Sequence, residues 1–310
     1  MARGTTVACM AALALQFGLQ PLLNRAFAGD VRSRSLLVVV CEGAKLALAA
    51  GTLALKSRVV PMAPWSLAES VRLSGLPAVT YAVQNVLIQL SMQHLSPLEF
   101  NLINQTKLLW TAVFVYLLLH KPFSVQQCGA MVMLVVASVL LSGGNADDAD
   151  VDAALTMDRF YYGYVPVVGA SVLSGVGAAL TQQSLQTHGR DASVVTMELC
   201  VYGALFLVAN LVASPGAVVD LTGWTPYTLI PVVTNAMGGL LVGTVTQLAG
   251  GIMKSYALIG GILLTGIVEA ALSDAAVLSP RVYIATALVI ASMYIYSMYP
   301  YVPKTKAKTA

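Results

Sequence analysis

Long apolar segments constrain the fold of this chain more than any other feature of its 310 residues. A helix that crosses a bilayer needs about 20 mainly apolar residues. The sequence holds ten such segments, at 6–24, 35–55, 73–93, 98–119, 124–142, 161–184, 193–213, 227–248, 252–271 and 281–299. Only 10% of the residues are charged, against about 25% in soluble globular domains, so the chain cannot coat a water-facing surface. We therefore predict an all-α polytopic membrane protein with ten transmembrane helices.

One long polar loop divides these segments into two groups of five. We predict a first five-helix half at 1–142, an acidic lumenal linker at 143–160, a second five-helix half at 161–300 and a basic tail at 301–310. Because five is an odd number, the two halves must insert with opposite orientation. Such inverted repeats are a recurring plan among transporters, with the substrate site near the midplane between them.

Lysines and arginines outside the apolar segments indicate the orientation, since they favour the cytosolic side. If the N-terminus is cytosolic, nine lie on that side: Arg3, Lys56, Arg58, Arg72, Lys121, Arg190, Lys304, Lys306 and Lys308. Five lie on the opposite side: Arg25, Arg32, Arg34, Arg159 and Arg281. We predict that both termini are cytosolic.

Ionisable side chains inside apolar segments are the main functional signals, because each costs roughly 2.5–3.5 kcal/mol at a helix centre on insertion scales. Glu42 and Lys45 are three residues apart, so they share a helix face and can pair. That pair is either a structural contact between helices or part of a substrate or proton path, and the sequence leaves both open.

Two lysines carry the strongest signal. Lys107 lies deep in an apolar segment with no acid near it in the sequence, and Lys254 follows the glycine pair Gly250-Gly251 at the start of another segment. A glycine pair ahead of a helix leaves amide N–H groups open at a positive helix end, which favours an anion. Both lysines belong to the fourth segment of their half, so we predict one central site for a doubly anionic group such as a pyrophosphate.

Tyr81, Gln84 and Asn85 form a polar stripe on the third segment, at i, i+3 and i+4. An aromatic ring beside two carboxamides could stack on a base and read its edge, whereas interhelical hydrogen bonding is the plainer interpretation. The sequence offers no constellation for catalysis, metal binding or a cofactor, so we predict none of these. A net charge of +3 without a basic face also argues against a nucleic-acid partner.

Four stretches together resemble the nucleotide-sugar transporters of the drug/metabolite transporter superfamily, in the branch of the CMP-sialic acid, UDP-galactose and UDP-N-acetylglucosamine carriers. They are Cys41-Glu42-Gly43-Ala44-Lys45-Leu46, the stretch 76–85, Asn104-Gln105-Thr106-Lys107 and Gly250-Gly251-Ile252-Met253-Lys254. Within that branch, 102–107, 231–239 and Tyr299-Pro300-Tyr301 look closest to the plant endoplasmic-reticulum carriers of UDP-N-acetylglucosamine and UDP-N-acetylgalactosamine.

The resemblance implies that Lys107 and Lys254 hold the phosphates and that Tyr81, Gln84 and Asn85 line the nucleotide pocket. It extends the substrate site to a further group of residues on two segments: Asn101, Asn104, Thr196, Glu198, Tyr202 and Gly203. On the seventh segment the CMP-sialic acid and UDP-galactose carriers show an Asn-x-Gln pattern, for which this chain has Thr196 and Glu198. That departure argues against CMP-sialic acid as the substrate.

These inferences predict an antiporter that brings a UDP-sugar into the lumen in exchange for a nucleoside monophosphate. A CMP-sialic acid or UDP-galactose antiporter of the same fold, and a proton-coupled metabolite exporter, remain the alternatives. Lys306 and Lys308 stand fifth and third from the C-terminus, which resembles a retrieval signal read by a coat-protein receptor of the early secretory pathway. We predict a Golgi or endoplasmic-reticulum membrane protein, with a homodimer left open.

Overall fold

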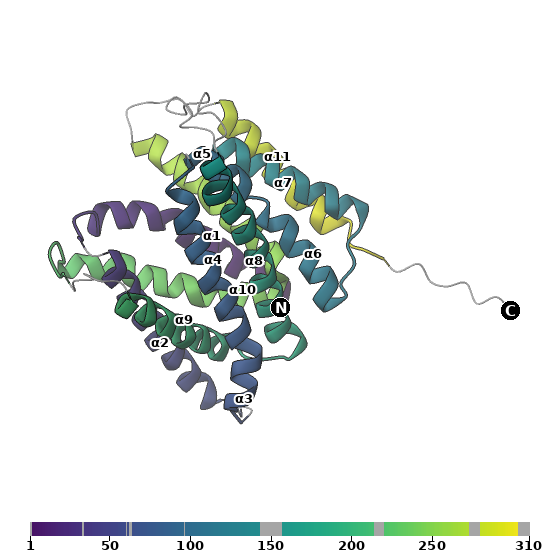
Figure 1. Ribbon diagram of the computed structural model, residues 1–310. Coiled ribbons are helices and arrows are strands. Elements are labelled where there is room, and N and C mark those ends of the chain that lie inside the picture. The colour runs from purple at the N-terminus through teal and green to yellow at the C-terminus, as the bar shows by residue number, and fades with distance from the viewer. Residues whose placement is uncertain are drawn as a thin grey trace.

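The computed structural model describes residues 2–32, 34–59, 61, 64–95, 97–142, 157–213, 220–272 and 280–302, and these residues form helices and no β-strand (Figure 1). The helices are α1 (Ala2–Phe27), α2 (Arg34–Ser57), α3 (Leu67–Ser70), α4 (Leu76–Met92), α5 (Pro97–Asn104), α6 (Lys107–Leu119), α7 (Val125–Ser142), α8 (Val165–Gln182), α9 (Ala192–Ala213), α10 (Leu229–Leu272) and α11 (Pro280–Met298). Short π-helical turns extend some of them, namely η1 (Val71–Gly75), η3 (Arg159–Tyr164) and η4 (Gln183–Thr187), and a 3₁₀ turn, η5 (Pro226–Thr228), precedes α10. Most of the predicted linker, 143–156, and the tail from 303 lie outside the described residues.

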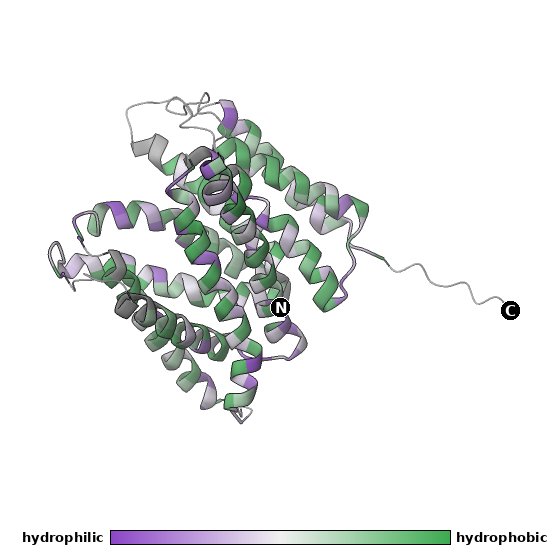
Figure 2. Ribbon diagram, in the orientation of Figure 1, coloured by the Kyte–Doolittle hydropathy of each residue, from purple (hydrophilic) through white to green (hydrophobic). Residues whose placement is uncertain are grey.

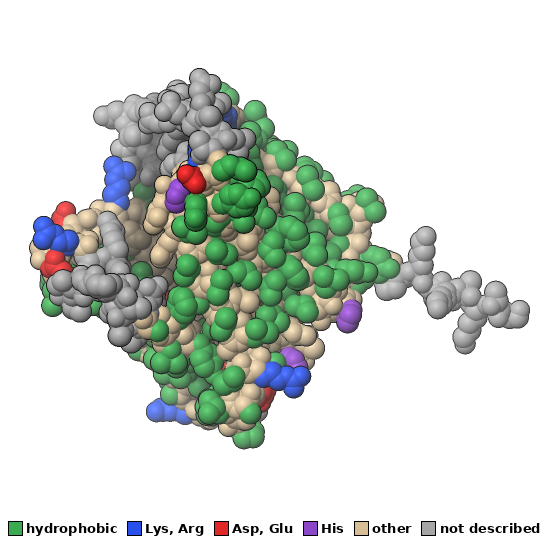
Figure 3. All heavy atoms as spheres, viewed as in Figure 1, with side chains coloured by type: hydrophobic (Ala, Val, Ile, Leu, Met, Phe, Trp, Pro, Cys, Tyr) green, Lys and Arg blue, Asp and Glu red, His purple; other side chains and the backbone are tan. Residues whose placement is uncertain are grey.

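Five helical stretches of the described chain are long and apolar enough to cross a membrane: Gly4–Phe27, Leu36–Ser57, Arg159–Thr187, Pro226–Val268 and Pro280–Met298. Large apolar side chains are exposed along the helices, for example Val7, Leu205 and Ile290. Hydrophobic residues predominate along the helices (Figure 2). Hydrophobic side chains cover much of the face in view, and most of its charged groups lie toward the edges (Figure 3). Such a surface suits contact with lipid, which confirms the predicted all-α membrane class.

Two of the predicted segments meet in one element, because 227–248 and 252–271 both belong to the 44-residue helix α10. Gly250 interrupts that helix with φ 86° and ψ 170°, a backbone conformation that glycine adopts without a steric penalty. The fourth predicted segment, 98–119, is also divided, since α5 ends at Asn104 and α6 begins at Lys107. Hydrogen bonds of the tighter i to i−3 type bridge this second division, from the amides of Thr106, Leu108 and Leu109.

The main contacts join helices that are far apart in the sequence. Helix α1 packs along α10, both α4 and α6 pack against α8, α2 packs on α9, and α7 packs on α11 (Figure 1). The largest buried apolar cluster combines α1, α6, α7, α10 and α11, around side chains such as Leu13, Leu134 and Val245. The core therefore forms between the two halves of the chain as well as within them.

Helix α1 carries a polar stripe at i, i+4 and i+8. Gln16 Nε2 donates to Gln20 Oε1 over 3.0 Å, and Gln20 Nε2 donates to Asn24 Oδ1 over 3.1 Å. The same Gln20 amide donates to the Pro231 carbonyl of α10 over 2.9 Å, and the Thr234 hydroxyl donates back to Gln20. In an apolar environment such bonds align neighbouring helices.

Glycines permit the closest helix crossings, and Gly175 gives a test. A Cβ atom on Gly175 of α8 would lie 2.7 Å from the Trp110 backbone of α6, so Gly175→Ala must push these helices apart. We expect the substitution to reduce stability by about 1–3 kcal/mol, the usual cost of overpacking, which a thermal unfolding curve of purified protein measures.

Gly51→Ala is the matched control, because a Cβ atom there would meet no atom of the described chain within 4 Å. Its unfolding temperature should stay at or above that of the parent protein, since alanine favours a helix over glycine. Equal behaviour of the two variants would contradict the close α6–α8 packing.

Candidate substrate site

A cavity of about 730 Å³ lies among α2, α4, α8, α9 and α10. Its walls are mainly apolar, which is typical of small-molecule sites that place a few polar groups in an apolar frame. The charged and polar side chains that line it are Glu42, Lys45, Tyr81, Asn85, Gln89, Thr181, Thr196, Thr246 and Lys254. Six of these nine were predicted from the sequence as substrate-site or associated residues: Glu42, Lys45, Tyr81, Asn85, Thr196 and Lys254.

The two predicted lysines come together. Lys254 lines the cavity, and Lys107 is close enough to Lys254 for their charges to interact. Each follows an interruption of its helix: Lys107 is the first residue of α6, and Lys254 lies in the first turn after Gly250. Half-helix N-termini of this kind carry partial positive charge and point at anionic substrate groups in transporters.

Neither ammonium group has a protein partner in the described part of the chain. No carboxylate there lies within 4.0 Å of Lys107 or Lys254, whereas the other buried or half-buried cations that the structure describes, such as Lys45 and Arg190, are paired. A half-buried lysine without a counterion is costly, so this region favours an added anion.

The glycine pair before Lys254 differs in one respect from the sequence prediction. We expected its amide N–H groups to be open to a ligand, but the Gly251 N–H donates to Gln182 Oε1 over 2.9 Å. The physical reason is that an unpaired buried donor is costly and a protein side chain satisfies this one. Lys254, rather than the Gly251 amide, is therefore the group available to an anion.

The predicted stripe on α4 divides between two environments. Tyr81 and Asn85 line the cavity, and Tyr81 lies against Gly177, where a Cβ atom would be 2.8 Å from the ring. Gln84 does not line it, and its buried Oε1 has no hydrogen-bond partner among the residues that the structure describes. Asn104 ends α5 away from the cavity lining, and the side chain of Asn101 lies outside the described part of the structure.

Glu42 and Lys45 form the ion pair that their spacing predicted, with Lys45 Nζ 2.6 Å from Glu42 Oε1. The stem of Lys45 crosses Gly239 of α10, where a Cβ atom would lie 2.5 Å from Lys45 Cδ. Gly239 thus provides the room for this pair at the cavity wall. Gly239 and Gly243, one helical turn apart on α10, both line the cavity.

Helix α9 presents its predicted residues on two faces. Thr196 and Gly203, seven residues apart, line the cavity with α2, α4 and α10. Glu198 and Tyr202 line a second, larger cavity of about 1130 Å³ between α2, α3 and α9. A helix has 3.6 residues per turn, so Glu198 and Tyr202 lie on a different face of α9 from Thr196 and Gly203. The two pairs therefore cannot line the same pocket.

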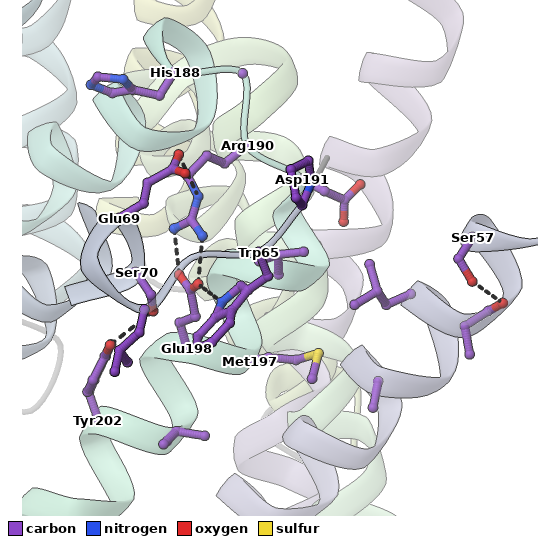
Figure 4. Close-up of a pocket in the computed structure, with 18 of the residues that line it drawn as sticks. Ser57, Trp65, Glu69, Ser70, His188, Arg190, Asp191, Met197, Glu198 and Tyr202 are labelled. Atoms are coloured by element: carbon purple, nitrogen blue, oxygen red, sulfur yellow. Dashed lines mark hydrogen bonds and ion pairs between the residues drawn. The ribbon is translucent and has the colours of Figure 1, made fainter. Parts of the chain in front are cut away.

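The second cavity is held together by Glu198 (Figure 4). Its carboxylate accepts hydrogen bonds from Arg190 (2.5 and 2.6 Å), Ser74 (2.5 Å) and the Trp65 ring nitrogen (2.8 Å). Glu69 adds a second carboxylate 3.8 Å from Arg190. The side chains of Arg190 and Glu198 are only 9% and 7% exposed. The hydrogen bonds that Arg190 donates to Glu198 hold the pKa of its guanidinium above the ordinary value.

Neighbouring contacts extend this cluster across the two halves of the chain. Ser70 and Tyr202 share a hydrogen bond of 2.9 Å, and Lys56 pairs with Asp191 over 2.8 Å. Burial alone would raise the pKa of the Asp191 carboxyl, but hydrogen bonds from Lys56 and from the Ser193 amide lower it below its usual value. Protein groups therefore satisfy the carboxylates of Glu198 and Asp191.

A comparison with known families decides the identity. A family model described as nucleotide-sugar transporter matches residues 35–297. The chain belongs to the nucleotide-sugar transporter family. It is accordingly a transporter and not an enzyme.

Individual relatives agree with that assignment. The chain is 38% identical over 266 residues to the UDP-N-acetylglucosamine transporter ROCK1 of Arabidopsis thaliana, covering 84% of this chain and 82% of that protein. It is 24% identical over 205 residues to the UDP-N-acetylglucosamine transporter of Homo sapiens, covering 65% of this chain and 62% of the human protein, which is less than two thirds of its length. A solved crystal structure superposes with a TM-score of 0.70 at 15% identity, covering 95% of this chain and 98% of that one, which shows a common fold.

Proposed function

We propose that this nucleotide-sugar transporter carries UDP-N-acetylglucosamine or UDP-N-acetylgalactosamine into the lumen of the endoplasmic reticulum or Golgi in exchange for UMP. The observation that carries the proposal is a pair of neighbouring lysines, Lys107 and Lys254, that have no counterion among the described residues; Lys254 lines the mainly apolar cavity and Lys107 lies close to it. A UDP-sugar and UMP both offer phosphate to these lysines, so a single site serves both directions. The names of the relatives support the choice of UDP-N-acetylglucosamine.

The other predicted residues fit the rest of such a ligand. Tyr81 and Asn85 offer a ring and a carboxamide to a pyrimidine base, and Thr196 offers a hydroxyl beside Gly203. Glu42 and Lys45 lie on the α2 wall, where they are suited to hydroxyl and acetamido groups of a sugar. We propose these residues, together with both lysines, as the substrate site.

The pattern of helix contacts supports an inverted repeat of five and five. In the first half, α1 meets the third and fourth segments of the second half, through Gln20 with Pro231 and Gly18 with Gly261. In the second half, α8 meets the third and fourth segments of the first half, through Gly177 with Tyr81 and Gly175 with Trp110. The contacts α2 with α9 and α7 with α11 pair the second and the fifth segments. If each segment is replaced by the equivalent segment of the other half, the same set of helix contacts results, as a pseudo-two-fold axis between the halves requires.

Alternating access follows from this arrangement if each end of the bundle closes in turn. With cytosolic termini, the cluster around Glu198 lies at the cytosolic end, where Ser74 and Trp65 of the first half meet Arg190 of the second. These bonds suit a closed cytosolic end. Obligatory exchange follows because an empty carrier with two uncompensated lysines reorients slowly.

Counter-exchange in proteoliposomes tests the proposal. We expect uptake of radiolabelled UDP-N-acetylglucosamine into vesicles loaded with UMP, with little uptake into empty vesicles. Parallel vesicles loaded with CMP, and a panel with CMP-sialic acid and UDP-galactose outside, separate the related antiporters. Uptake that follows an imposed pH gradient and ignores the internal nucleotide would instead establish a proton-coupled exporter and reject exchange.

A further inference from the structure

The interruption of α10 at Gly250 divides this element into two helical rods. A break inside a membrane helix frees carbonyl groups on its N-terminal side and an amide group on its C-terminal side. In an apolar environment each freed group needs a partner. The hydrogen-bond partners that the structure records for these freed backbone groups come from two glutamines, Gln182 and Gln186.

Gln182, the last residue of α8, satisfies the C-terminal side of the break. Its Oε1 accepts the Gly251 N–H over 2.9 Å, and the side chain is 4% exposed. A Cβ atom on Gly250 would lie 2.9 Å from Gln182 Nε2, so the amide lies directly against the break. This bond fixes the first turn of the helical rod that carries Lys254.

Gln186, one turn later in η4, satisfies the N-terminal side of the break. Its Nε2 donates to the carbonyls of Thr246 and Gln247 over 3.0 and 3.1 Å. Gln182 Nε2 donates to Gln186 Oε1 over 2.9 Å, so the two amides form one chain that spans the break. Lys121, just after α6, also donates to Gln186 Oε1, over 2.7 Å.

We propose that Gln182 and Gln186 are positioning residues that hold the broken helix α10 at the angle that presents Lys254 to a phosphate group. This inference rests on the proposed function, since it assumes that Lys254 meets phosphate. The two glutamines themselves do not line the cavity, so they act on the ligand through Lys254. The same chain of amides connects the break to the end of α6, the helix that begins with the other lysine.

The test compares Gln182→Met with Gln183→Met in purified full-length protein. Methionine keeps the length of glutamine and removes its hydrogen bonds. Gln183 is adjacent in the sequence, and its amide makes one long contact of 3.5 Å to the Leu118 carbonyl, away from the break. We expect Gln182→Met to weaken UMP binding by about tenfold or more, the effect of losing a charge-assisted contact, while Gln183→Met binds UMP as the parent does.

The affinity for uridine distinguishes a positioning role from a merely structural one. Because uridine lacks phosphate, its affinity should be the same in Gln182→Met and in the parent protein. An equal loss for uridine and UMP, or no loss for either, overturns the proposal. If Gln182→Met yields no folded protein, Gln186→Glu is judged by the same criteria, since it keeps an acceptor for Lys121 and loses the donor to Thr246 and Gln247.

A double substitution separates failure of this inference from failure of the proposed function. In a Lys254→Ala background, Gln182→Met should cause no further loss of UMP affinity, because residues acting through one group are not additive. An additive loss contradicts the positioning role. If Lys254→Ala itself binds UMP as tightly as the parent, the phosphate site of the proposed function fails.

Discussion

Replacing Lys254 or Lys107 with methionine is expected to abolish exchange of UDP-N-acetylglucosamine for UMP while leaving the protein as stable as before, or more stable. Transport should fall because each lysine supplies a charge-assisted contact to phosphate, worth about 1.5–3 kcal/mol or roughly a 10- to 100-fold change in affinity. Stability should not fall because neither ammonium has a counterion in the described structure, and the two charges repel each other. Proteoliposome uptake and thermal unfolding of the same preparations measure both effects.

Arg72→Met is the control for these lysine variants. Arg72 is an exposed cation of η1 outside both cavities, so its loss should alter neither uptake nor the unfolding temperature. Lys254→Arg should recover only part of the activity, since a planar guanidinium does not reproduce the compact ammonium. Normal UDP-sugar uptake in both methionine variants would falsify the phosphate site.

Removing the carboxylate of Glu198 is expected to produce the largest loss of stability. Breaking a buried pair by deleting one partner costs about 3–5 kcal/mol, because a buried charge is left uncompensated. The loss of stability in Glu198→Ala should lie near the lower limit of this range, because Glu69 and Ser74 remain in contact with Arg190. Thermal unfolding of the detergent-solubilised protein gives the measurement.

Two comparisons sharpen that experiment. Lys56→Met breaks the pair with Asp191, but the Lys56 side chain is 48% exposed, so we expect a change of less than about 1 kcal/mol. Combining Glu198→Met with Arg190→Met removes both charges and should restore much of the stability that Glu198→Ala loses, as apolar replacement of buried pairs does. A Glu198→Ala effect no greater than that of Lys56→Met contradicts the structural role of this cluster.

Much of the fold and part of the site follow from local sequence rules. The apolar segments are helical because their composition suits a membrane, although 227–248 and 252–271 both belong to α10 and 98–119 is divided between α5 and α6. The division of α10 was predictable from Gly250-Gly251, and the Glu42–Lys45 pair from its spacing of three residues. The convergence of the two lysines followed from their equivalent places in the two halves. These inferences depend either on residues that are close in the sequence or on the position of a segment within its group of five.

The remainder depends on contacts that no local pattern encodes. Glu198 was grouped with Thr196 and Gly203 because they share a family pattern, yet the helix repeat directs it to Arg190 and to Ser74, 124 residues earlier. The glutamines at 182 and 186 were not singled out, although two amides one turn apart in an apolar segment were the available signal. Their partners lie on α10, 60 or more residues later, so the packing of helices had to be known first.

The polar stripe of α1 has a consequence for how the protein is made. The partners of Gln20 on α10 lie 211 and 214 residues later, so at typical synthesis rates roughly 10–40 s pass between synthesis of α1 and synthesis of these partners. During that interval Gln16, Gln20 and Asn24 already satisfy one another along the same helix. Helix α1 can therefore lie in lipid with these polar side chains hydrogen-bonded to one another before α10 is synthesised.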